Sequence, residues 1–229
     1  MSVVERRLRL ARIWSNRILL RLGGCFDGDV VNVSAGDDGD KEGNTYATYF
    51  AKASSYSITN YSPGSFRGYA GRENEHLLDL TNDLPDAMKA RFDVALNHTV
   101  MEHIFEVRKA FANLCAMSRD VVIVVVPFVQ MEHESEAFKD YWRFTPNCLR
   151  QLLRENGLSV VYEAETGIPF AASYLLMIGA RQPDRWRPVL PAWTPIMDAG
   201  GWVGGNKWLS VCFASLVRIW GRLRAGTKG

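Results

Sequence analysis

The sequence predicts an α/β fold in which a mostly parallel, seven-stranded sheet carries helices on both faces. Short apolar runs alternate with amphipathic segments between residues 29 and 180, a pattern typical of parallel strands joined by crossover helices. One run, DVVIVVVPF at residues 120–128, is apolar after its first residue, as in a strand covered on both faces. The 229 residues, 47% of them hydrophobic, suffice to bury a large core.

Seven segments have the β-branched content and the terminating turn residues that predict strands. The second and third of these segments include the turn that follows the strand. They are residues 29–34, 54–64, 76–85, 92–97, 120–128, 158–165 and 172–180.

Four amphipathic segments predict helices, at residues 3–22, 99–117, 145–157 and 207–224. In residues 99–117, apolar side chains recur at spacings of three and four and form one helical face. The segment TPNCLRQLLRENG has the clearest ends. Its Thr145 can cap the helix, Pro146 suits the first turn and Gly157 can end it.

Basic residues gather at the two ends of the chain. Residues 1–24 hold six arginines against one glutamate, and residues 181–229 hold eight lysines or arginines against two aspartates. Because the net charge is only +2, the middle of the chain is acidic. We therefore expect a basic N-terminal helix (1–24), a central domain (25–180) and a basic extension rich in Trp, Pro and Gly (181–229).

The basic ends leave two interpretations open. They can bind an anionic membrane surface, or they can pack on the acidic body of the protein. Nucleic-acid binding is disfavoured, since no recognition motif accompanies the charge. The N-terminal arginines interrupt any signal-peptide core, and the late apolar run WLSVCFASLV is too short to span a bilayer. A cytoplasmic location is expected, with peripheral contact at the inner membrane face as an extension of it.

The four cysteines are far apart and form no CxxC pair, so neither a zinc cluster nor a disulfide framework is indicated. The stretch FDVALNHTVMEH is also not expected to bind a metal. Its His98 and His103 are five residues apart, roughly 140° around a helix, whereas paired ligands on a helix use a spacing of four. Glu102 and His103 are instead expected in the first turn of the helix at residues 99–117, where a carboxylate suits the helix dipole.

Small and polar residues follow the predicted strands. In an open α/β sheet, ligands bind outside the carboxyl ends of the strands, where the strand order reverses. Small residues let a ligand approach the backbone, and a carboxylate can accept a hydrogen bond from an amine. The set fits a nucleoside-shaped cofactor. Its members are Ser34-Ala35-Gly36-Asp37, Asn60-Tyr61, Asp79-Leu80-Thr81, Asn97-His98-Thr99 and Pro127-Phe128.

Taken in order, these segments resemble the class I S-adenosylmethionine-dependent methyltransferases, and most closely a type 11-like branch met in polysaccharide biosynthesis. The resemblance spans about residues 29–163 and implies a Rossmann-like, doubly wound fold. The segments that carry it are VVNVSAG, LLDLTNDLP, FDVALNHTVMEHIFEVRKAFANL and VVIVVVPFVQMEHESEAFKDYWRFTPNCLRQLLRENGL.

The resemblance implies S-adenosylmethionine as the cofactor and gives the strand-end residues their roles. Asp79 is expected near the adenine amine, Leu80 against the ring, and Asn97 under the sulfonium end. His98 is expected beside Asn97 in the cofactor pocket. The methionine part of the cofactor is expected along Ser34, Ala35 and Gly36.

Two positions depart from the pattern of the family. The first loop reads AGDDGD where many members have a fuller GxGxG. Asn60 stands where an acidic residue usually holds the ribose hydroxyls, and an amide forgoes the stronger charge-assisted hydrogen bond. These departures keep a non-catalytic binding subunit among the alternatives.

His133 is the candidate general base, since it lies in a polar segment after the fifth strand, on the side expected for the methyl acceptor. Methyl transfer is an in-line displacement, and a hydroxyl acceptor benefits from losing its proton as it attacks. Asp140 can orient His133, while Arg143 can pair with Asp140 or bind an anionic substrate group. Alternatively, the three residues only tie the segment to the body through ion pairs.

The sequence therefore predicts an S-adenosylmethionine-dependent methyltransferase that modifies a sugar hydroxyl of a glycan or glycolipid intermediate. A methyltransferase acting on small molecules or natural products is the first rival. The second rival is the non-catalytic binding subunit.

Overall fold

In the computed structural model, the described residues are 3–65, 67–167, 172–197 and 199. They contain a seven-stranded sheet with the order β3-β2-β1-β4-β5-β7-β6. β7 runs antiparallel to both neighbours, and the other pairs are parallel. The predicted mostly parallel sheet is confirmed. The strands are β1 Gly28–Val33, β2 Ala53–Asn60, β3 Glu75–Leu77, β4 Phe92–His98, β5 Ser118–Val129, β6 Ser159–Glu165 and β7 Ser173–Ala180.

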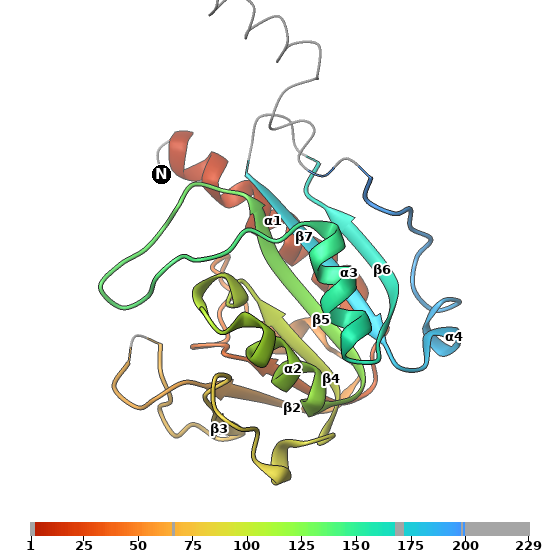
Figure 1. Ribbon diagram of the computed structural model, residues 1–229, viewed down its shortest axis with the longest axis horizontal. Helices are drawn as coiled ribbons and strands as arrows, with labels where there is room; N and C mark the ends of the chain where they lie inside the picture. Colours follow the sequence, from red (N-terminus) through yellow and green to blue (C-terminus); the bar gives the residue numbers. More distant parts are fainter. Residues whose placement is uncertain (1–2, 66, 168–171, 198, 200–229) are drawn as a thin grey trace, which may run out of the picture.

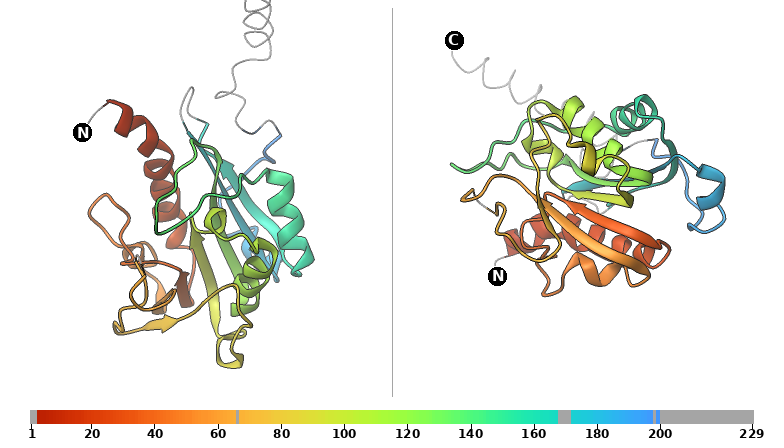
Figure 2. Two further views of the ribbon diagram at one scale, coloured as in Figure 1. Left: turned by 60° about the vertical axis from the view of Figure 1, so that its left-hand side comes forward. Right: turned by 90° about the horizontal axis from the view of Figure 1, so that it is seen from below.

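Helices cover both faces of this sheet (Figures 1 and 2). α2 and α3 pack on one face, and α1 lies on the other. The α-helices are α1 Val3–Gly23, α2 Val107–Met117, α3 Pro146–Glu155 and α4 Pro183–Trp186. Three short 3-10 helices are η1 Tyr46–Tyr49, η2 Asp86–Met88 and η3 Met101–His103.

Alternate side chains of β5 enter two separate cores, which explains its unbroken apolar sequence. Val122 and Val124 face α2 and α3, where they join Phe111 in one core. Val121 and Ile123 face the opposite way, into the core that contains α1. All five side chains are fully buried. Because successive strand residues point to opposite faces, a strand covered on both sides needs an apolar residue at every position.

Helix α1 belongs to the body of the protein. Its Ala11, Leu19 and Leu22 are buried in the same core as β5 and β7. The connection from β1 to β2 contains η1 but no α-helix, so α1 and η1 together cover this face of the sheet. Membrane contact by α1 would therefore have to use its exposed face, which includes Arg17 and Arg21.

Two predicted boundaries were wrong. The helix expected at residues 99–117 begins only at Val107, and η3 precedes it as a separate turn. Thr99 has a φ of 53°, which an α-helix does not accommodate, and its N–H donates to Val125 O at the edge of the sheet. The strand expected within residues 76–85 is short, because the chain turns after Leu77. The helix predicted at residues 207–224 lies outside the described residues.

Other predictions concern the ends of elements and the cysteines. Thr145 accepts a hydrogen bond from Cys148 N–H at 3.2 Å and caps α3, as predicted. The described cysteines Cys25, Cys115 and Cys148 are free. Within residues 3–65, 67–167, 172–197 and 199, we find no helix with both the length and the apolar character needed to cross a membrane.

The close approach of α1 to η1 can be tested with two neighbouring glycines. A Cβ on Gly23 would overlap the backbone carbonyl of Tyr49, whereas a Cβ on Gly24 would meet open space. We expect Gly23→Ala to lower the free energy of unfolding by about 1–3 kcal/mol, because the overlap pushes the end of α1 away from η1. Gly24→Ala, the matched control, should change it little. Urea unfolding of both variants measures the difference, and equal stability would contradict this packing of α1.

Candidate active site

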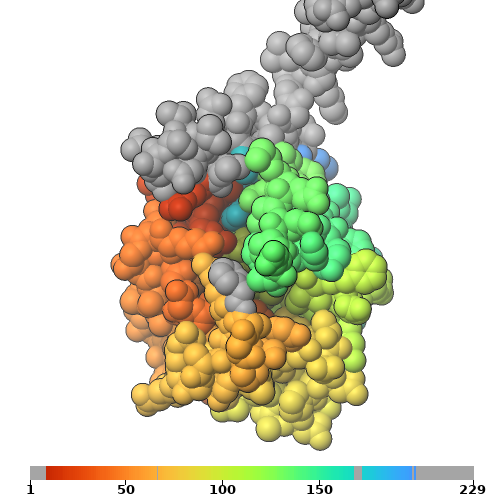
Figure 3. Space-filling model, turned by 90° about the vertical axis from the view of Figure 1, so that its left-hand side faces the viewer, coloured from red at the N-terminus to blue at the C-terminus, as the bar shows by residue number. Residues whose placement is uncertain are grey.

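A cavity of about 610 Å³ lies at the carboxyl ends of the strands. Its walls come from α1, from the loops after β1, β2, β3 and β4, and from the segment that follows β5. The strand order reverses between β1 and β4, so the cavity lies where an open α/β sheet binds its ligands. Figure 3 looks onto this side, where the molecule is hollowed between the green segment after β5 and the orange segments around β2. Its volume suits a ligand of nucleoside size or larger.

The structure brings the predicted cofactor residues together, with one exception. Asn97 does not belong to the cavity wall. The predicted cofactor residues that do line the cavity are Ser34, Ala35, Gly36, Asn60, Asp79, Leu80 and His98.

The loop after β1 is held by the side chain of Asn60. The Gly36 N–H donates to Asn60 Oδ1 at 2.6 Å, and Asn60 Nδ2 donates back to Gly36 O at 2.8 Å. Ser34 and Gly36 have φ values of 59° and 66°, a left-handed conformation that bends the loop around the cavity. Asn60 is 1% exposed, and its side-chain amide forms the hydrogen bonds that hold this loop in shape.

Glu75 explains why residue 60 is an amide. Asn60 Nδ2 also donates to Glu75 Oε1 at 2.5 Å, and the Glu75 side chain is fully buried. Burial raises the pKa of Glu75, but hydrogen bonds from Asn60 and from the N–H groups of Arg72 and Ala70 outweigh it, so the pKa is lowered. An acidic residue at position 60 would therefore face another carboxylate. Glu75 was not among the residues predicted for the site, because it lies beside Asn60 only through the β2–β3 pairing.

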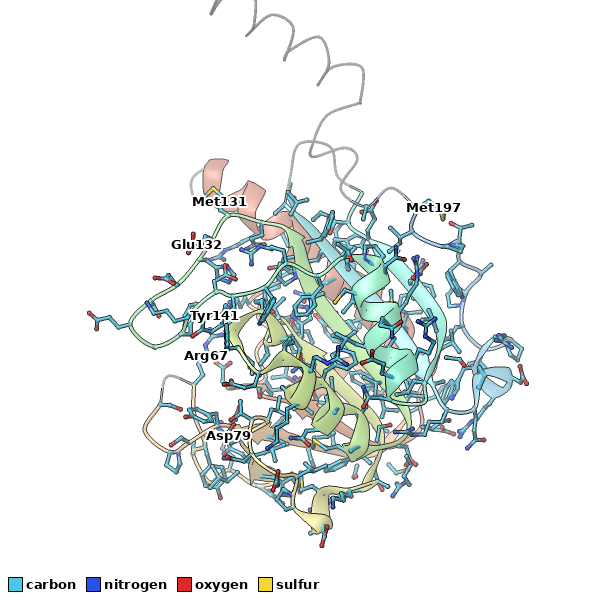
Figure 4. The ribbon with its side chains drawn as sticks, viewed as in Figure 1. Arg67, Asp79, Met131, Glu132, Tyr141 and Met197 are labelled. Carbon is cyan, nitrogen blue, oxygen red and sulfur yellow. The ribbon has the colours of Figure 1, made fainter. Side chains whose placement is uncertain are left out.

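Asp79 and Leu80 form a fixed wall after β3. Asp79 Oδ1 accepts hydrogen bonds from the N–H and the hydroxyl of Thr81, both at 2.8 Å. Asp79 Oδ2 accepts from Asn82 Nδ2 at 2.9 Å. The carboxylate is half-buried and lines the cavity, and Leu80 beside it is 3% exposed. Figure 4 shows Asp79 on the same side of the molecule as Arg67 and Tyr141. This wall offers an acceptor next to an apolar surface.

Asn97 joins two strands beneath the cavity. It is fully buried, and its Nδ2 donates to Val33 O at 3.0 Å, which ties the end of β4 to the end of β1. Its Oδ1 has no hydrogen-bond partner among the described residues. Its expected place under the sulfonium end of a cofactor stays a prediction.

His98 is neutral and positions Arg12. The Ser15 hydroxyl donates to Arg12 O, so His98 Nε2–H donates to Ser15 Oγ at 2.9 Å. His98 Nδ1 then accepts from Arg12, 3.3 Å away. Burial, and next the charge of Arg12, lowers the pKa of His98 well below its usual value. Two residues of α1 thus contact His98, and one of them, Arg12, lines the cavity itself. The helical pattern alone could not show this contact.

Among the described residues, three cations line the cavity: Arg12, Lys41 and Arg67. Arg12 also donates to Thr99 Oγ1 at 2.6 Å. Desolvation, followed by the charges of Arg12 and Arg67, lowers the pKa of Lys41 to about 8. Like charges gathered in this way favour an anionic group between them. The basic N-terminal helix was predicted from the sequence, but its contribution of Arg12 to this cavity was not.

His133, Asp140 and Arg143 come together on the opposite side of the cavity, where His133 lines the wall and the other two lie behind it. His133 Nδ1 lies 3.1 Å from Asp140 Oδ2, and the His133 N–H donates to the same oxygen at 2.9 Å. Arg143 binds both oxygens of Asp140, at 2.5 and 2.6 Å. Burial raises the pKa of Asp140, but the hydrogen bonds from Arg143 and His133 lower it to about 2. Asp140 is therefore a fixed negative charge behind His133.

The three residues also tie the segment to the body, so the two sequence interpretations are compatible. Arg143 donates to the backbone carbonyl of Met131 at 3.2 Å, and Asp140 is fully buried. His133 alone of the three lines the cavity, and its side chain is 40% exposed. Its imidazole therefore has access to a bound molecule.

Glu102 and His103 lie in η3, which corrects their expected place in the first turn of α2. Since α2 begins at Val107, its dipole does not explain Glu102. The Glu102 side chain is 1% exposed, and burial raises its pKa to about 8. The His103 ring packs against His133 with 5.0 Å between the ring centres. The backbone carbonyl of Glu102 accepts from Tyr141 N–H at 2.8 Å and holds the segment after β5 over η3.

Aromatic side chains surround the mouth of the cavity. Phe105 is 62% exposed and Tyr141 is 47% exposed, and their ring centres are 5.3 Å apart. Trp142 lies beside them and donates its indole N–H to Ile104 O. Phe144, in contrast, is buried in the core. The exposed rings can contact an acceptor molecule, while Phe144 serves packing.

The Asn60–Glu75 contact can be tested by substitution. We expect Asn60→Asp to lower the free energy of unfolding by about 1–3 kcal/mol, because it removes the donor to Gly36 O and places two carboxylates together. Glu75→Gln, added to Asn60→Asp, should recover part of the loss by restoring a donor. Urea unfolding of the single and double variants gives the coupling energy. Independent effects of the two substitutions would contradict the contact.

Among known proteins, no family model matches the chain and no curated protein matches it. Solved structures do match. Magnesium protoporphyrin IX methyltransferase from Synechocystis PCC 6803, with S-adenosylhomocysteine bound, has a TM-score of 0.54 and 13% identity, and the match covers 79% of this chain and 88% of that one.

The 1,6-didemethyltoxoflavin-N1-methyltransferase from Burkholderia thailandensis was solved with 1,6-didemethyltoxoflavin and S-adenosylhomocysteine bound. It has a TM-score of 0.51 and 20% identity, and the match covers 78% of this chain and 80% of that one. The chain therefore has the Rossmann-like fold of these two methyltransferases.

Proposed function

We propose that this protein is an S-adenosylmethionine-dependent methyltransferase. The observation that carries the proposal is the cavity at the reversal of strand order, which combines a tight loop, a fixed carboxylate beside leucine side chains, and a group of cations. The shared fold with methyltransferases supports it.

The wall residues fit the parts of this cofactor. The Asp79 carboxylate can accept hydrogen bonds from the adenine amine, with Leu80 against the ring. Arg12 and Lys41 can bind the methionine carboxylate, and the backbone around Gly36 allows close approach. Because Asn60 holds this loop, its departure from the acidic pattern serves the fold and does not by itself favour a non-catalytic protein.

When bound, S-adenosylmethionine supplies an electrophilic methyl group on a sulfonium. His133 would accept the proton of an acceptor hydroxyl as that oxygen attacks, and Asp140 would hold the imidazole and stabilise its charged form. Arg143 keeps Asp140 ionised and in place. His133 would thus act as a base on the wall opposite the proposed cofactor residues.

We further propose a sugar hydroxyl of a glycan or glycolipid intermediate as the acceptor. The exposed rings of Phe105 and Tyr141 offer an apolar platform at the mouth of the cavity for the face of a sugar ring. The exposed Arg17 and Arg21 of α1 would favour peripheral contact with an anionic membrane from the cytoplasmic side. A small-molecule acceptor is the alternative, and it needs no such contact.

Cofactor binding is tested by calorimetry with S-adenosylmethionine and S-adenosylhomocysteine. We expect Asp79→Ala to weaken binding about tenfold or more, through the lost acceptor. Asp79→Asn keeps a side-chain oxygen that can accept the hydrogen bonds from Thr81. It therefore distinguishes a lost contact with the cofactor from a disrupted turn. Asp83→Ala is the matched control, since Asp83 lies in the same loop, is fully exposed and pairs with Lys109. No binding to the unchanged protein at millimolar concentration would rule out the proposed cofactor.

Catalysis by His133 is tested by the release of S-adenosylhomocysteine in the presence of a panel of sugar acceptors. We expect His133→Ala to lower turnover about 10²- to 10⁴-fold and to leave cofactor binding nearly unchanged, because a general base acts on the acceptor. His76→Ala serves as the control, since His76 lies outside the cavity wall. If His133→Ala weakened cofactor binding as strongly as Asp79→Ala, His133 would belong to the cofactor pocket instead.

A further inference from the structure

Glu102, His103 and His133 form a cluster that the proposed base mechanism uses only in part. Each residue offers one ligand atom, and the three atoms lie within 4.8 Å of one another. His103 and His133 line the cavity, with Glu102 buried next to them. Spacing along a single helix disfavoured a metal in this region. The fold creates the cluster in another way, by placing the segment after β5 against η3.

The carboxylate of Glu102 is buried without a partner. Neither of its oxygens has a hydrogen bond within the described part of the chain. His103 Nε2 lies 3.7 Å from Glu102 Oε1, which is too long for a hydrogen bond. Arg143, a nearby cation, already pairs with Asp140. A buried carboxylate in this state is costly unless a cation or a proton joins it.

His103 is oriented as metal-binding histidines are. His103 Nδ1 donates to Lys139 O at 2.7 Å, because a carbonyl can only accept, and the lone pair of neutral His103 is therefore on Nε2. That nitrogen is the one near Glu102. A hydrogen bond from a histidine to a backbone carbonyl is typical of the surroundings of bound metals. His133 Nδ1 lies 3.1 Å from Asp140 Oδ2, but this buried nitrogen has no hydrogen-bond partner within the described part of the chain.

We propose that Glu102, His103 and His133 bind a divalent transition-metal ion of the Zn²⁺ class, with an open coordination position toward the cavity. Two imidazoles and one carboxylate are a ligand set of catalytic zinc sites. Tetrahedral ligands at about 2.1 Å from a metal are about 3.4 Å apart. The ligand atoms, now within 4.8 Å of one another, would have to close by at most about 1.4 Å, a change within the reach of side-chain rotation.

The role of this ion in catalysis rests on the proposed function, whereas its binding does not. The open position would take the oxygen of the acceptor hydroxyl and lower its pKa, so that its proton leaves to water. That oxygen then bonds to the methyl carbon as the carbon–sulfur bond breaks and its electron pair passes to sulfur. His133 would act as a ligand in this state, so the ion would replace it in activating the acceptor.

Zinc binding is measured by calorimetry on the full chain after treatment with a chelator. A Cys148→Ser background removes an exposed thiol that can bind Zn²⁺ by itself. We expect one Zn²⁺ per chain. The affinity for Zn²⁺ should be at least about 100-fold lower in both Glu102→Gln and His103→Asn. His76→Asn, which changes a histidine outside the cluster, should bind as the unchanged protein does. Circular dichroism confirms that each variant is folded.

Absence of stoichiometric binding would overturn the site, and so would equal affinity in Glu102→Gln. Binding of S-adenosylhomocysteine to the same chelator-treated protein is measured separately. Cofactor binding without Zn²⁺ binding would overturn the metal site alone, and Zn²⁺ binding that is lost in Glu102→Gln would support the site whatever the cofactor result.

Discussion

The packing of helix α1 on the sheet is the interaction on which the cavity depends. The connection between β1 and β2 provides no α-helix, so this face of the central strands would be open without α1 and η1. Burial of Leu19 and Leu22 contributes about 1.5–3 kcal/mol each. The same packing brings Ser15 and Arg12 to His98 at the end of β4. The many arginines of α1 are typical of a surface helix, yet α1 forms part of the wall of the cavity.

Much of the proposed cofactor side of the cavity could be predicted from the sequence, because it depends on local pattern. Strand ends are visible in the sequence, and parallel strands bring their carboxyl ends to one edge, so Ser34, Asp79 and His98 meet there. Asn97 ends its strand in the same way, yet its side chain bonds to Val33 O beneath the cavity. The direction of a side chain at a strand end depends on its neighbours in space, which the pattern does not contain.

The remaining features of the site arise from contacts between residues far apart in sequence. An amide at position 60 can donate a hydrogen bond to Glu75, which lies against it on the neighbouring strand β3. The turn η3 replaces the first part of the expected helix because Thr99 adopts a left-handed conformation at the sheet edge. Glu102 meets His133 only after the segment following β5 folds back over η3. Helical periodicity could not reveal any of these contacts.

The proposed acceptor side, which holds Glu102, His133, Asp140 and Arg143, concentrates charge in a largely buried space, and this allows two chemical mechanisms. Arg143 neutralises Asp140, which leaves Glu102 as the carboxyl group without a partner in the described cluster. With Glu102 protonated, the His133 imidazole would be available beside the cavity as the proposed base. With a divalent ion bound, the same imidazole would be a ligand and the ion would activate the proposed acceptor. Both options place the chemistry on the wall opposite Asp79 and Leu80.

A crystal structure of the complex with S-adenosylhomocysteine tests the central claim most directly. The account predicts the adenine against Leu80 with its amine at Asp79, and the homocysteine part along the loop at Gly36 toward Arg12. The sulfur should face the side of the cavity that carries His133. A ligand bound elsewhere, or an adenosine turned toward His133 and away from Asp79, would contradict the assignment of the two walls.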